Sequence, residues 1–130
     1  MRYLGLDYGT KRVGVAVSDD AGRFAFPKET LLNDHRLVAR IAEIATLEKV
    51  QAIVIGDARS LSGGHNKITD EADRFAENVK NLTKLTMFRI REAYSSAEAM
   101  RFAPAHHRHD DSAAAAIILQ RFLDEHGQGS

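Results

Sequence analysis

The fold is indicated first by one segment near the start of the chain, Leu4-Gly5-Leu6-Asp7-Tyr8-Gly9-Thr10-Lys11-Arg12-Val13-Gly14-Val15-Ala16-Val17-Ser18-Asp19. Two apolar stretches flank a short Gly-Thr-Lys turn, a pattern that predicts two antiparallel strands joined as a β-hairpin. Asp7 stands at the end of the first stretch, where burying a carboxylate costs free energy unless a partner compensates its charge. Two interpretations stay open at this point: Asp7 binds a ligand, or it caps the turn that follows it.

The composition is that of an ordinary globular protein. With 130 residues, the chain is long enough for one domain, residues 1–130, that buries its own core. The sequence contains no cysteine, which excludes disulfides and thiolate metal sites and permits a reducing compartment. No apolar run approaches membrane-spanning length and no secretion signal opens the chain, so we expect a cytoplasmic protein without a membrane partner.

The formal net charge is zero, so the overall charge balance does not by itself indicate nucleic acid as a partner. A local basic patch can still bind phosphates when acidic residues elsewhere cancel its charge. Several basic residues fall in predicted loops or at the ends of predicted elements near one rim, namely Lys11, Arg12, Arg59, Lys67 and Arg108. They are candidates for a phosphate-binding patch, and solvated surface charge is the alternative.

Hydrophobic periodicity predicts strands and helices in alternation after the hairpin. The expected strands are residues 2–7, 12–18, 22–26, 50–56 and 85–90, the third of them ending at Pro27. The expected helices are residues 37–45, capped by Asn33 or Asp34, then 68–79, 95–102 and 111–125. This order predicts an α/β fold: a five-stranded mixed sheet whose first three strands are antiparallel, with helices on both faces.

Acidic residues follow several of the predicted strands. Asp7, Asp57 and Glu92 stand at or just after strand ends, and Asp110 and Asp111 open the last predicted helix. Binding sites in such sheets gather at the carboxyl ends of parallel strands. If these carboxylates converge, they repel one another unless a cation lies between them, and hard oxygen ligands select Mg²⁺ or Mn²⁺. A pair of such ions about 4 Å apart can hydrolyse a phosphodiester.

The same residues also have structural interpretations. Asp57 fits a loop former, Glu92 fits a solvated strand end, and Asp110 fits an N-cap better than a ligand. Asp111 in the first helical turn can simply complement the helix dipole. The histidine-rich tract at 106–109 has adjacent histidines and no cysteine, a poor pattern for zinc, which favours a solvated or phosphate-facing tract.

Three segments together resemble the YqgF (RuvX) family of ribonuclease-H-like proteins. They are Asp7-Tyr8-Gly9-Thr10-Lys11-Arg12-Val13-Gly14-Val15-Ala16, Arg91-Glu92-Ala93-Tyr94-Ser95-Ser96-Ala97-Glu98-Ala99 and Asp111-Ser112-Ala113-Ala114-Ala115. Their order and spacing agree with the family over essentially the whole chain, and the first and last are specific in combination. Actin-like ATPases and sugar kinases share the first turn, but they close two such domains around a nucleotide and this chain has room for one.

The resemblance implies a ribonuclease-H-like fold and hydrolysis of phosphodiesters with Mg²⁺ or Mn²⁺. It implies that Asp7, Glu92 and Asp111 form the catalytic, metal-binding set. It further implies a nuclease that matures the 5′ end of pre-16S ribosomal RNA. The alternative is a Holliday-junction resolvase acting on structured or branched DNA, and the oligomeric state is expected to be a monomer or a homodimer.

The chain departs from the family pattern near two strand ends. Arg91 replaces the first acid of the middle motif, and Ala93 replaces the arginine that usually follows. Gly56-Asp57-Ala58 stands where Gly-Leu-Pro is usual. Asp57 would either compensate for the lost acid or form an ion pair with Arg91. A nucleic-acid-binding module without catalysis is therefore a further alternative.

Overall fold

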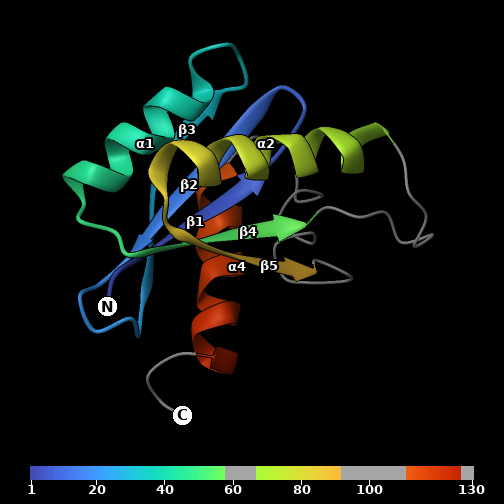
Figure 1. Ribbon diagram of the computed structural model, residues 1–130. Coiled ribbons are helices and arrows are strands. Elements are labelled where there is room, and N and C mark those ends of the chain that lie inside the picture. Colours follow the sequence, from blue (N-terminus) through green and yellow to red (C-terminus); the bar gives the residue numbers. More distant parts are fainter. Residues whose placement is uncertain (58–66, 92–110, 127–130) are drawn as a thin grey trace.

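The computed structural model describes residues 1–57, 67–91 and 111–126 (Figure 1). Its strands are β1 (Tyr3–Tyr8), β2 (Arg12–Ser18), β3 (Ala25–Leu32), β4 (Ala52–Asp57) and β5 (Thr86–Arg91), and its helices are α1 (Leu37–Leu47), α2 (Lys67–Thr83) and α4 (Asp111–His126). The strand order is β3-β2-β1-β4-β5. The first three strands pair antiparallel, whereas β1–β4 and β4–β5 pair parallel. The predicted α/β fold with a five-stranded mixed sheet is confirmed.

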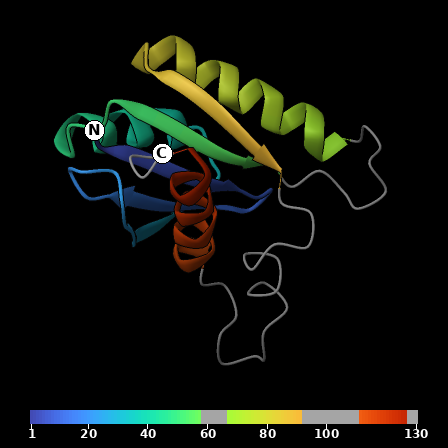
Figure 2. The ribbon, with the colours of Figure 1, turned by 90° about the horizontal axis from the view of Figure 1, so that it is seen from below.

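Helices cover both faces of the sheet, as Figure 2 shows from below. The core on one face joins β1 and its neighbours to α1 and α2, and the core on the other face joins them to α4. Successive side chains of β1 alternate between these faces, so Leu6 and Tyr8 pack toward α1 and α2 while Tyr3 packs toward α4. By the same alternation, Asp7 points to the α4 face at the carboxyl end of the central strand.

Small residues let α4 approach the sheet closely. A Cβ atom added to Gly5 of β1 would lie 2.7 Å from the Cβ of Leu119, closer than real side chains pack. On the helix side, Ala114 and Ala115 are buried against the sheet. The alanine-rich first half of α4 therefore lies almost on the backbone of β1 and β2, which fixes where the helix begins.

The third strand is longer than predicted and is displaced along the sequence. The expected strand, residues 22–26, ended at Pro27, whereas β3 runs from Ala25 to Leu32 and includes that proline. β3 is an edge strand, and Pro27 pairs with Ala16 at the point where the β2–β3 register shifts. A proline is tolerated there because edge strands and bulges do not require its missing N–H.

The predicted cap of the first helix is also wrong in detail. The N-cap residue of α1 is Arg36, which makes no side-chain capping bond. Asp34 instead accepts a hydrogen bond from the Arg36 backbone N–H at 2.9 Å, in the turn before the helix. Asn33 holds a neighbouring turn. The helix expected at residues 95–102 lies outside the described residues.

Within the described ranges, no helix combines the length and the apolar composition that crossing a bilayer requires.

Candidate active site

Asp7 is buried at the carboxyl end of the central strand. The residue is only 3% exposed. In the sheet it pairs with Gly14 of β2 and with Gly56 of β4. Directly paired residues point to the same face, so the carboxylate is flanked on both sides by residues without side chains. No side chain of the neighbouring strands therefore covers the carboxylate at these two positions, and a buried charge of this kind requires compensation.

Asp111 reaches the same place from the other end of the chain. A Cβ atom added to Gly14 would overlap the carbonyl oxygen of Asp111 and would lie 3.0 Å from its Cβ. The first residue of α4 therefore lies directly over Gly14, the cross-strand partner of Asp7. The structure thus brings together two of the three predicted acids, which are 104 positions apart (111 − 7) in the sequence.

Arg12 binds one of these acids. Its Nε atom donates a hydrogen bond to Oδ2 of Asp111 at 3.2 Å, and the two side chains are 34% and 21% exposed. The sequence makes Arg12 a candidate for a phosphate-binding patch, with solvated surface charge as the alternative, and in the structure its guanidinium binds Asp111. A half-exposed ion pair of this kind is screened by water and contributes little to stability. Its main consequence is that positive charge stands at the edge of the acidic site.

Asn33 holds the turn between β1 and β2. Its backbone N–H donates to the carbonyl of Lys11 at 2.9 Å, and its side-chain amide donates to the carbonyl of Gly9 at 2.8 Å. The two hydrogen bonds hold the turn that follows Asp7 at both Gly9 and Lys11, and the side chain of Lys11 is exposed. Sequence reasoning considered Asn33 only as a helix cap, because no local pattern reports a contact 24 residues away.

The other predicted residues are not placed. Glu92, Arg59 and Arg108 lie outside the described residues, as do Asp110 and the tract at 106–109. Lys67 begins α2, and its side chain is not described.

The two departures from the family pattern lie side by side in the sheet. Arg91 ends β5, and its partner in the parallel ladder is Asp57, the last residue of β4. The backbone register therefore suits the predicted pairing of these two residues, although their side chains are not described. β4 lies between β1 and β5, so Asp57 stands one strand from Asp7 and Arg91 stands two strands from it.

The described donors suit a hard divalent cation. No cluster of three or more His, Cys, Asp or Glu side chains suited to a metal ion occurs within residues 1–57, 67–91 and 111–126. The donor set described at this end of the sheet is therefore the carboxylates of Asp7 and Asp111. Mg²⁺ in proteins is commonly held by one or two carboxylates while keeping several waters, so these residues fit such an ion.

Comparison with known proteins finds a family and relatives that match nearly the whole chain. The model of a family described as "RuvX: Holliday junction resolvase" matches residues 1–125. A relative from Nitratidesulfovibrio vulgaris, named "Putative pre-16S rRNA nuclease", is 38% identical over 133 residues, covering 95% of this chain and 94% of the relative. A relative of the same name from Bordetella petrii is 35% identical over 123 residues, covering 93% of each chain.

Solved structures share the fold at low sequence identity. The structure of Thermus thermophilus RuvC matches with a TM-score of 0.62 and 13% identity, covering 98% of this chain and 97% of the other. The Fowlpox virus resolvase, in complex with Holliday junction DNA, matches with a TM-score of 0.60 and 9% identity, covering 96% and 98%. The predicted ribonuclease-H-like fold is confirmed. With the family model matched over nearly its whole length, the chain belongs to the RuvX family.

Proposed function

We propose that this chain is a metal-dependent nuclease whose reaction takes place at the carboxyl end of β1. The observation that carries this proposal is the meeting of Asp7 and Asp111 across Gly14. Glu92 is proposed as the third acid of the set. The proposed cofactor is Mg²⁺ or Mn²⁺, for which carboxylate oxygens are suitable ligands.

Each residue has a distinct part in the proposed reaction. A bound Mg²⁺ or Mn²⁺ supplies a Lewis acid that activates water and stabilises a leaving oxygen. Asp7 holds its oxygens rigidly because it lies in the central strand, and Asp111 is fixed by the first turn of α4. Arg12, 3.2 Å from Asp111, is placed to contact a phosphate bound by the same acids. Lys11 on the adjacent turn, with Arg59, Lys67 and Arg108, is proposed to steer the phosphate backbone toward the site.

The proposed substrate is RNA, and specifically the 5′ region of pre-16S ribosomal RNA. The names of the curated relatives, at 33–38% identity over nearly the whole chain, support this choice. We propose a single domain that works in the cytoplasm, where ribosomal precursors are processed.

Resolution of four-way DNA junctions is the second candidate. The description of the matched family as a Holliday junction resolvase favours it, as do similar structures that hold Holliday junction substrate. Paired cuts across a junction need two active sites related by symmetry, so this activity would require a homodimer. A module that binds nucleic acid without cutting it is the remaining alternative, because Arg91 stands where the family has an acid.

One preparation of the protein tests these candidates together. We expect that, with Mn²⁺, it cleaves an RNA fragment spanning the mature 5′ end of 16S rRNA and leaves a four-way DNA junction intact. The same RNA with a chelator in place of Mn²⁺ is the control and stays uncut. Symmetric cuts in the junction alone would establish the resolvase instead. Salt-dependent binding without cleavage in Mg²⁺ and Mn²⁺ would establish the binding module.

A further inference from the structure

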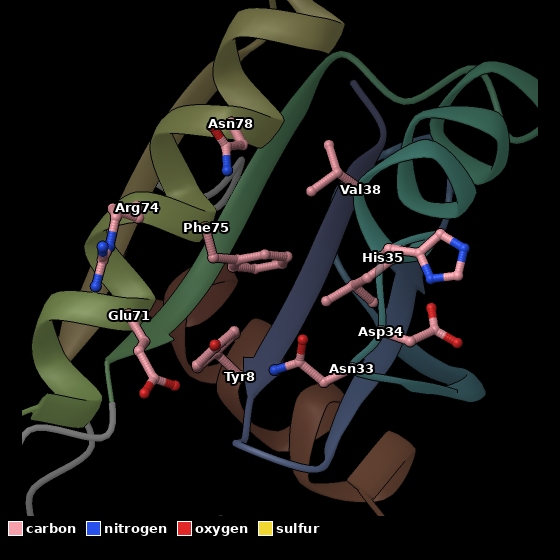
Figure 3. A pocket seen from close by; sticks show the side chains of 10 residues that line it. Tyr8, Asn33, Asp34, His35, Val38, Glu71, Arg74, Phe75 and Asn78 are labelled. Carbon is pink, nitrogen blue, oxygen red and sulfur yellow. The ribbon is translucent and has the colours of Figure 1, made fainter.

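A pocket of about 330 Å³ opens on the opposite face of the sheet from Asp111, beside the carboxyl end of β1 (Figure 3). It lies between α1 and α2, and the rings of Tyr8 and Phe75, 4.8 Å apart between centroids, form part of its lining. Tyr8 directly follows Asp7 in the chain, and their side chains leave the strand on opposite faces. The pocket and the acidic site are therefore separated by the thickness of one strand.

Polar groups without partners line this pocket. The hydroxyl of Tyr8, the carboxylate of Glu71 and the amide of Asn78 make no hydrogen bond or ion pair in the described part of the chain. Tyr8 is only 7% exposed, and a buried tyrosine hydroxyl usually has a partner. Among the described side chains, only Nε of Arg2 is both fully buried and without a hydrogen-bond partner. The Tyr8 oxygen also lacks a partner, so it is not fully buried and some of its surface is accessible. The Tyr8 hydroxyl therefore faces the pocket.

Asn33 connects the pocket to the acidic site. Its amide nitrogen donates to the carbonyl of Gly9, in the turn that follows Asp7. Its carbonyl oxygen accepts no hydrogen bond in the described residues and is directed toward the pocket (Figure 3). The amide nitrogen of Asn33 thus contacts the turn after Asp7, while its carbonyl oxygen is available to a ligand in the pocket.

The chemistry of the lining selects the class of ligand. Apolar surface from Phe75 and Val38 lies beside acceptors and donors from Tyr8, Asn33 and Asn78. A nucleobase has this combination, with flat apolar faces and a polar edge that side chains read in unstacked RNA. The carboxylate of Glu71 favours a base edge that donates two N–H groups side by side, as guanine does with N1 and N2. Arg74 on the same helix also lines the pocket and supplies a positive charge for the phosphate that a nucleotide carries.

We propose that this pocket binds one unstacked base, guanine best, of the RNA strand that is cut at Asp7 and Asp111. The proposal rests on the proposed function, since it assigns a recognition subsite to the same substrate. The RNA would pass over the carboxyl end of β1. One of its phosphates would lie at the acidic site on one face of the sheet, and a nearby base would enter the pocket on the opposite face.

Binding of mononucleotides without metal tests the pocket directly. We expect GMP to shift the NMR signals of the Tyr8 and Phe75 rings, and to bind more tightly than AMP, CMP or UMP. Glu71→Gln is expected to weaken GMP binding about tenfold, since it removes the charge from a hydrogen bond to the base. Tyr8→Phe, which removes only the hydroxyl, is expected to weaken it severalfold. Inorganic phosphate is expected to leave the ring signals unchanged.

The matched control is Glu77→Gln, which changes an exposed glutamate on the same helix that does not line the pocket. Equal GMP affinities for Glu71→Gln and Glu77→Gln, or ring signals that GMP does not move, overturn the proposal. This readout is independent of cleavage. If the wild-type chain cuts RNA but does not bind GMP, only the pocket assignment fails. If GMP binds in the pocket but no RNA is cut, the nuclease proposal fails instead.

Discussion

Asp7→Asn is expected to abolish Mn²⁺-dependent cleavage of RNA while the chain stays folded. The substitution keeps the size of the side chain but removes the charge that the proposed metal site needs. Replacing even an outer partner of a metal ligand commonly lowers affinity or activity by about 10- to 100-fold. Loss of a direct ligand should therefore lower the single-turnover cleavage rate by more than about a hundredfold.

The matched control for this prediction is Asp124→Asn, which changes an exposed aspartate of α4 whose carboxylate accepts a hydrogen bond from the Gln120 amide. Its cleavage rate is expected to equal that of the wild type. Thermal unfolding should show that Asp7→Asn is folded, because it removes one of two neighbouring negative charges rather than adding one. Undiminished cleavage by a folded Asp7→Asn variant would contradict the assignment of Asp7.

Gly14→Ala is expected to destabilise the fold and to impair cleavage together. The added Cβ would overlap the carbonyl oxygen of Asp111, which belongs to the backbone and cannot rotate away. Either α4 moves off the sheet, which displaces Asp111 from Asp7, or the strand distorts. Overpacking of this kind typically lowers the free energy of unfolding by about 1–3 kcal/mol, and we expect the upper end. Urea unfolding, followed by circular dichroism, measures the change.

Thr30→Val provides the control for Gly14→Ala. Thr30 of β3 pairs with Gly14 across the β2–β3 ladder, yet its side chain is exposed. A β-branched replacement there should change the free energy of unfolding by less than about 0.5 kcal/mol. If Gly14→Ala is as stable and as active as Thr30→Val, the close approach of α4 to β2 is not a feature of the folded protein.

Much of the fold was predictable because its signals are local. The hairpin of β1 and β2, the apolar run of β4 and the periodicity of α2 each follow from residues near one another in the sequence. The predicted position of β3 is wrong because a proline such as Pro27 commonly ends a strand, and a sequence does not reveal which strand lies at a sheet edge, where proline is tolerated. Gly14 carried a usable signal, since an isolated glycine inside a strand often marks the close approach of another backbone.

The contacts that build the site are less accessible to sequence reasoning. Arg12 and Asp111 are 99 residues apart, and nothing in either segment alone indicates that they form an ion pair. The pocket beside Tyr8 likewise combines residues from a strand, a turn and two helices. Asp7 and Asp111 were identified through motifs of a known family, and their meeting required the fold. The role of Glu92 stays a prediction, because this residue lies outside the described part of the chain.

Anomalous diffraction from a crystal soaked in Mn²⁺ tests most directly whether Asp7 and Asp111 form one metal site. We expect an anomalous peak between the two side chains, with a carboxylate oxygen of each within about 2.2 Å of the ion, a distance close to those of other small divalent cations. The guanidinium of Arg12 should then no longer occupy the coordinating oxygen of Asp111. Anomalous peaks at other carboxylates, with none between Asp7 and Asp111, would contradict the proposed site.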